Sequence, residues 1–160
     1  MERFFKYTLT ILISTVAAME FYQVVMRYIL EIPVMGLEEM LVYPTIWLYF
    51  LGSVNASRED TQIKANVLDV FLKTERSRLI VRVIADLMSV IVAAWLTFWA
   101  YDYFRYALRV WKESPTLYIP TFYGECALFV GLSLMTFYAA WYLVKNILKL
   151  RRALGVQQGA

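Results

Sequence analysis

The sequence contains no histidine and a single cysteine, Cys126. Without histidine the chain lacks the imidazole group, the commonest metal ligand and the side chain that ordinarily titrates near neutral pH. One cysteine cannot form an intrachain disulfide or a cysteine cluster for zinc or iron. We therefore expect no metal, haem or other cofactor. Enzymes and redox subunits built on such centres are disfavoured as function classes.

Charged residues are also scarce, at 18% of the 160 residues, whereas hydrophobic residues make up 61%. The mean hydropathy is +0.53. Soluble domains are usually about half apolar and about one quarter charged. Aromatic residues, at 17%, are abundant, as in the Trp and Tyr belts at membrane interfaces. The composition predicts an integral membrane protein.

Four apolar runs are each long enough to cross a hydrocarbon core, which needs about 20 helical residues. They cover residues 7–26, 37–57, 80–101 and 121–144. Strands of a membrane barrel would instead alternate in polarity over about ten residues. The first run continues past Glu20 to full membrane thickness, so we expect an uncleaved span there and no signal peptide. The predicted fold class is all-α, with residues 1–160 forming one domain of four transmembrane helices.

Lys and Arg residues are distributed unevenly between the two ends of these spans. Twelve lie at the end formed by the N-terminus, the 58–82 segment and the C-terminus, and four lie at the other end. Cytoplasmic loops carry the excess of Lys and Arg in membrane proteins. We therefore expect both termini and the middle loop to be cytoplasmic.

The middle loop itself shows a helical pattern. Asp60 is placed to cap a helix, and four apolar residues follow on one face: Ile63, Val67, Val70 and Phe71. This spacing predicts a short amphipathic helix over residues 61–73 that lies on the membrane surface. It serves either as a plain surface helix or as a docking element for a partner.

Several ionisable residues fall inside the predicted spans, where such groups usually face a protein interior or a pathway. Glu20 shares a stripe of the first span with Arg27, while Arg82 and Asp86 have the spacing of an i, i+4 pair. Glu125 lies near the outer end of the fourth span. Two interpretations remain open, an ion or proton path and pairing between helices. Pairing of Arg27 with Glu20 or Glu125, and of Arg82 with Asp86, is favoured because no two acids lie together in mid-span.

Two adjacent acids, Glu38 and Glu39, begin the second span. Negative charge at a helix N-terminus is favoured by about 0.3–1 kcal/mol through the helix dipole and the free N–H groups. Arg27, across a short loop, is placed to neutralise one of them. This explains why acids are tolerated here but not why there are two.

The sequence shows no catalytic set. It has no Gly-rich phosphate loop, no nucleophile with a base partner and no metal-ligand spacing. The basic residues follow membrane sidedness and form no stripe for nucleic acid. We expect neither an enzyme nor a nucleic-acid-binding protein.

The order of features over residues 20–140 resembles the small membrane subunit of tripartite ATP-independent periplasmic (TRAP) transporters. In that family an Arg-Tyr pair often ends the first span, and two acids, a tryptophan and a glycine follow along the second. The matching residues are Arg27, Tyr28, Pro33, Glu38, Glu39, Trp47 and Gly52. The segment SPTLYIPTFYGECALFVG, residues 114–131, resembles the family's link into its fourth span.

The chain departs from the family pattern after the second span. The family often has His-Ile followed by an Asp, whereas this chain has Gln62-Ile63 and Asn66. Any role of that histidine or aspartate therefore does not carry over.

The resemblance implies a non-catalytic subunit of a bacterial or archaeal cytoplasmic membrane. Its partners would be a large multi-span subunit that carries the transport and sodium sites, a periplasmic protein that delivers an organic acid, and the lipid bilayer. The candidate contact or structural residues are Glu20, Arg27, Tyr28, Glu38, Glu39, Trp47, Gly52, Arg82, Asp86 and Glu125. The alternative is a self-contained four-helix transporter or channel that uses Glu20 and Glu125 as ion sites.

Overall fold

The computed structural model describes residues 2–32, 34–60 and 75–155. They form four helices: α1 (Glu2–Tyr28), α2 (Leu37–Glu59), α4 (Glu75–Val110) and α5 (Phe122–Gly155). The described residues contain no strand beyond one isolated bridge between Glu113 and Pro120. The predicted all-α class is confirmed. The amphipathic helix expected over 61–73, with Gln62 and Asn66, lies outside the described residues.

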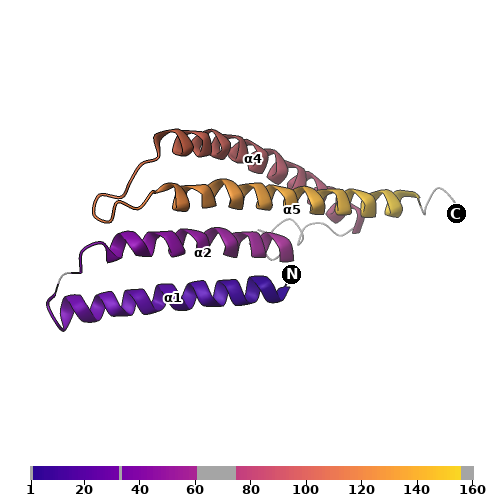
Figure 1. Cartoon of the computed structure of the whole chain (residues 1–160). Coiled ribbons are helices and arrows are strands. Elements are labelled where there is room, and N and C mark those ends of the chain that lie inside the picture. Colours follow the sequence, from indigo (N-terminus) through magenta and orange to yellow (C-terminus); the bar gives the residue numbers. More distant parts are fainter. Residues whose placement is uncertain (1, 33, 61–74, 156–160) are drawn as a thin grey trace.

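The helices lie in an open row in the order α1, α2, α5 and α4 (Figure 1). Extensive contacts join α1 to α2, α2 to α5, and α5 to α4. The α1–α2 loop and the α4–α5 loop lie at the same end of the row, which we call the loop end. The start of α1 and the end of α5 lie toward the opposite end, which we call the terminal end (Figure 1).

Three of the helices are long and apolar enough to cross a membrane: Arg3–Tyr28, Ser77–Val110 and Phe122–Arg152. The third predicted span, residues 80–101, lies within α4, which begins earlier and runs on to Val110. α2 has 23 residues, enough for about 35 Å at 1.5 Å per residue. It is not among the three, because acids in its first turn, internal Pro44 and polar residues interrupt its apolar stretch.

Very few side chains are buried in this row. Within the described part of the chain, the buried hydrophobic residues are Val54, Ala100, Ala107 and Ala127. Large apolar side chains such as Phe21 and Tyr49 are about 70% exposed, at 71% and 70%. Contiguous apolar surface of this extent indicates contact with lipid or with another protein.

The contact between α2 and α5 depends on small residues of α5. Gly124 lies against Tyr43 and Ile46, and Gly131 lies against Phe50. A Cβ atom added at Gly131 would come within 2.7 Å of Phe50 Cδ1 and 2.8 Å of Phe50 Cβ. Because the Phe50 Cβ is fixed to the backbone, α2 and α5 would have to separate.

We predict that Gly131→Ala lowers the stability of the α2–α5 contact by about 1–3 kcal/mol through overpacking. The measurement is unfolding of the purified protein by SDS titration in mixed micelles. Gly52→Ala is the matched control, since nothing lies within 4 Å of a Cβ added there. It should be neutral or stabilising, by up to about 1 kcal/mol of helix propensity. Equal losses in both variants would contradict the packing argument.

Candidate functional site

Glu39 joins the start of α2 to the loop between α4 and α5. Its carboxylate accepts hydrogen bonds from the Ser114 hydroxyl and from the backbone N–H groups of Thr116, at 3.1 and 3.2 Å, and Leu117, at 3.1 Å. Ser114 is buried, with 4% of its surface exposed. Three donor groups on one carboxylate form charge-assisted hydrogen bonds that fix the loop against the start of α2.

The α4–α5 loop has internal bonds that shape it to receive Glu39. The Thr121 N–H and hydroxyl both donate to the Lys112 carbonyl, at 2.8 and 3.0 Å, and the Ser114 N–H donates to the Ile119 carbonyl at 2.9 Å. Pro115 and Pro120 lie in this loop, between the end of α4 at Val110 and the start of α5 at Phe122.

The two loops touch at Gly36, which has φ 86°. A Cβ added there would lie 2.8 Å from the Leu117 side chain. Both the left-handed backbone and the close approach therefore require glycine at this position. The loop end is thus a single contact surface formed by both helical hairpins.

Glu38 points to the other neighbour of α2. It accepts a hydrogen bond from Gln23 Nε2 at 2.8 Å and lies 3.9 Å from Arg27 Nη1. The Arg27 guanidinium also lies 5.8 Å from the centre of the Tyr28 ring. Of the partners considered for Arg27, the structure selects Glu38, and the expected pairing with Glu20 or Glu125 is wrong.

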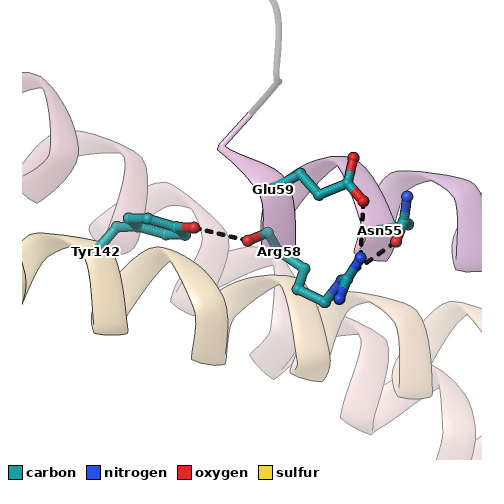
Figure 2. A network of polar contacts seen from close by, with 4 residues as sticks. All are labelled: Asn55, Arg58, Glu59 and Tyr142. Atoms are coloured by element: carbon teal, nitrogen blue, oxygen red, sulfur yellow. Dashed lines mark hydrogen bonds and ion pairs between the residues drawn. The ribbon is translucent and has the colours of Figure 1, made fainter. Parts of the chain in front are cut away.

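A second set of polar contacts holds the terminal end of α2. Arg58 donates from Nε to Asn55 Oδ1 at 3.2 Å and from Nη2 to Glu59 at 2.7 Å (Figure 2). The Arg58 carbonyl accepts the Tyr142 hydroxyl hydrogen at 2.6 Å, which ties α2 to α5 (Figure 2). Beyond Tyr142, α5 continues for thirteen residues to Gly155.

The expected pair of Arg82 with Asp86 is wrong. Arg82 Nη2 lies 2.6 Å from Asp60 Oδ2, at the C-cap of α2. Asp86 Oδ2 instead accepts a hydrogen bond from Asn146 Nδ2 of α5 at 2.6 Å. The i, i+4 spacing permits a pair on one helix but does not exclude partners on neighbouring elements, and here both side chains bond to other elements.

Asn146 was missed by sequence reasoning, although it is 4% exposed and holds a carboxylate. Thr97 and Thr136, whose hydroxyls are 2.8 Å apart, form a similar bridge between α4 and α5. For Thr97 and Thr136 the available signal was a polar residue within an apolar span, since such residues often bond across helix interfaces in membranes. Asn146 follows Lys145 directly, at the basic end of the helix, and gave no such signal.

The remaining candidates lie apart from one another. Trp47 Nε1 donates to the Tyr123 carbonyl at 2.9 Å, so it ties α2 to α5. Glu125 lies in the first turn of α5, within electrostatic reach of Tyr43 and Tyr103. Glu20 is exposed on α1, which α2 separates from α5. The structure therefore does not bring Glu20 and Glu125 together.

The described residues contain no group of three side chains that could hold a metal ion. A shallow, open groove of about 440 Å³ lies on α1 along Ser14, Thr15, Ala18, Met19 and Tyr22. It involves one helix and is not enclosed. The arrangement as described offers contacts between helices and no reaction centre.

We predict that Glu39→Ala loosens the α4–α5 loop. Hydrogen exchange of the Thr116 and Leu117 amides should speed up severalfold, because their acceptor is removed. Glu38→Ala is the matched control, since Glu38 does not contact this loop, and exchange there should stay unchanged. Exchange is followed by mass spectrometry in detergent. Unchanged exchange in Glu39→Ala would show that the loop is held by its internal bonds alone.

We predict that Asn146→Leu destabilises the α4–α5 contact by about 1–2 kcal/mol, because the Asp86 carboxylate loses its donor. The double variant Asp86→Leu with Asn146→Leu should lose less, since no polar group then remains unpaired. SDS unfolding of both variants provides the test. Ser89→Ala, which removes only a bond to its own helix at Ala85, is the control.

The comparison with known protein families matches residues 16–150 to "Tripartite ATP-independent periplasmic transporters, DctQ component". The comparison with curated proteins finds no match. The family match covers most of the chain. It includes α2 and α4 completely, parts of α1 and α5, the Arg27–Glu38 pair and the loop held by Glu39. The chain therefore belongs to the DctQ family and is a small membrane permease subunit of a TRAP transporter.

Proposed function

We propose that this chain is a non-catalytic scaffold subunit. It packs against a large multi-span membrane subunit, which performs sodium-driven uptake of an organic acid delivered by a periplasmic binding protein. Membership in a tripartite transporter family supports the existence of partner subunits. The observation that carries the scaffold role is the open row of helices, which leaves long apolar faces uncovered.

The charge pattern supports a location in the cytoplasmic membrane with both termini in the cytoplasm. Among described residues, the terminal end holds Arg3, Lys6, Arg58, Arg78, Arg82, Lys145, Lys149, Arg151 and Arg152. The loop end holds Arg27, Arg105, Arg109 and Lys112. The positive-inside rule assigns the richer end to the cytoplasm.

We propose further that α2 is the fourth span of one transmembrane domain. It lies between α1 and α5, both of which are apolar enough to cross a membrane. Its two ends are tied to theirs, at Glu38 and Glu39 on one side and at Arg58 on the other. Because α2 is held at both ends between α1 and α5, it crosses the membrane together with these two spans.

The alternative, a self-contained transporter, needs an enclosed path between helices. Glu20 and Glu125 lie on helices that α2 separates, and Glu38 and Glu39 are engaged in contacts between helices. The intramembrane acids in the described part of the chain are therefore dispersed along the row. This dispersal favours the scaffold over a channel.

We predict that the tagged chain, purified from its native host in mild detergent, brings with it one large multi-span protein in fixed ratio. Liposomes that hold the chain alone should show no flux. Liposomes that hold both membrane subunits, supplied with the binding protein, should accumulate an acid from a labelled panel of carboxylates and sulfonates. Uptake should stop when potassium replaces sodium.

The opposite result would be ion flux by the chain alone. Glu20→Gln and Glu125→Gln separate the two functions: both variants should abolish flux in a self-contained transporter. If the chain is a scaffold, liposomes that hold the unmodified chain or either variant alone should all show no flux. Recovery of the chain alone, with flux that depends on these acids, would replace the proposal by the alternative.

A further inference from the structure

Glu20 lies in the apolar middle of α1, the helix at one edge of the row. α1 runs from Glu2 to Tyr28, so its midpoint is residue 15. Glu20 is five residues beyond, or about 7.5 Å along the axis at 1.5 Å per residue. A hydrocarbon core extends about 15 Å to either side of its midplane. The carboxyl group is therefore at hydrocarbon depth.

Glu20 has no polar partner in the described part of the chain. It is exposed, and no hydrogen bond or ion pair reaches it. The nearest basic residue on α1, Arg27, lies about 10 Å farther along the axis and is engaged with Glu38 and Tyr28. Ionisable groups at this depth are costly and nearly always paired or turned toward protein.

Glu20 lies at the margin of the face of α1 that packs on α2, about 60° around the helix from Gln23, and its side chain is exposed. Gln23 and Phe5 mark the side toward α2, since they contact Glu38 and Arg58. Ala17 and Val24, three residues before and four after Glu20, share its face, and both are exposed. A continuous strip beside the α2 contact is thus uncovered, and it holds one carboxyl group that has no partner in the described part of the chain.

We propose that this strip, formed by Ile13, Ala17, Glu20 and Val24, is the contact surface for a transmembrane helix of the large subunit, and that this helix supplies an Arg or Lys to pair with Glu20. The inference rests on the proposed function. It adds which face of α1 makes the contact and which type of residue pairs with Glu20. A basic group at matching depth would neutralise both charges. Ala17, one turn from Glu20, permits close approach of a second helix.

The chemistry of α1 argues against the other occupants. A second copy of this chain on the same strip, related by a twofold axis, would bring two Glu20 carboxylates together, and such like-charge contacts are strongly unfavourable. Lipid alone would leave the carboxylate unpaired. The groove along Ser14, Thr15 and Ala18 lies about half a turn away around α1 and carries no charge.

Photo-crosslinking tests the face directly. A benzoylphenylalanine residue replaces Val24 in one variant and Ile11, on the groove side of α1, in another. Both positions are exposed, at 49% and 65%. Crosslinks form in native-host membranes, and peptides are sequenced by mass spectrometry. We expect the probe at residue 24, and not at residue 11, to capture a membrane segment of the large subunit that contains an Arg or Lys.

Charge variants test the pairing. Glu20→Lys should lower the ratio of large subunit to this chain in the purified complex by about tenfold or more, as expected for repulsion at a buried charge pair. Glu20→Gln, which keeps a polar group of the same size, should lower it less. Glu31→Lys makes the same charge change in the α1–α2 loop and is the matched control. Changing the captured basic residue to Glu should restore assembly of Glu20→Lys.

The outcomes separate the two proposals. If the unmodified chain recovers no large subunit, the proposed function fails. If it recovers the subunit but Glu20→Lys does so equally, or if residue 11 crosslinks in place of residue 24, only the present inference fails. Crosslinks between two copies of this chain at residue 24 would also overturn it. Should Glu20→Lys fail to accumulate, the crosslinks from residues 11 and 24, made with Glu20 intact, still support or overturn the inference.

Discussion

A row of helices one helix thick cannot bury a core. Each helix packs extensively against at most two neighbours, so the described chain hides only a few side chains, among them Val54 and three alanines. In a hydrocarbon surrounding, apolar surface gains little from facing another helix instead of lipid. The relative positions of these helices therefore depend on close packing at glycines and on a small number of polar contacts.

Those polar contacts are concentrated near the two ends of the row, and they explain why two acids begin α2. Consecutive residues of a helix point about 100° apart, so Glu38 and Glu39 reach different neighbours. Glu38 meets Gln23 and Arg27 of α1, while Glu39 holds the loop that joins α4 to α5. One turn of α2 thereby links both helical hairpins. At the other end, Asp60 with Arg82 and Arg58 with Tyr142 join the end of α2 to α4 and α5.

Much of the fold could be predicted from the sequence, because hydropathy and helix length are local properties. The positions of the four helices, the break between Pro115 and Pro120, and a contact from Arg27 to the acids of α2 follow from such local signals. The order of the helices does not, since a face that meets lipid is as apolar as one that meets a helix.

Contacts between distant residues were the other failure of prediction. Arg82 and Asp86 have the spacing of a pair on one helix, yet each finds its partner on another element. The bond from Leu117 to Glu39 joins positions 78 apart in the chain. No periodicity links such positions, because the contact exists only after α2 and α5 lie side by side. A contact across one short loop, such as that of Arg27 with Glu38, was easier to predict from the sequence.

The thirteen residues of α5 beyond Tyr142 have a consequence for how the protein sits in a membrane. Tyr142 is level with the end of α2 through its bond to Arg58, so this part of α5 extends past the end of α2 by about 20 Å. It carries Lys145, Lys149, Arg151 and Arg152. Each such charge near an anionic lipid surface is attracted by about 1 kcal/mol. In the proposed orientation these charges hold the end of α5 at the cytoplasmic surface, and the contacts of α5 with α2 and α4 fix the depth of the neighbouring helices as well.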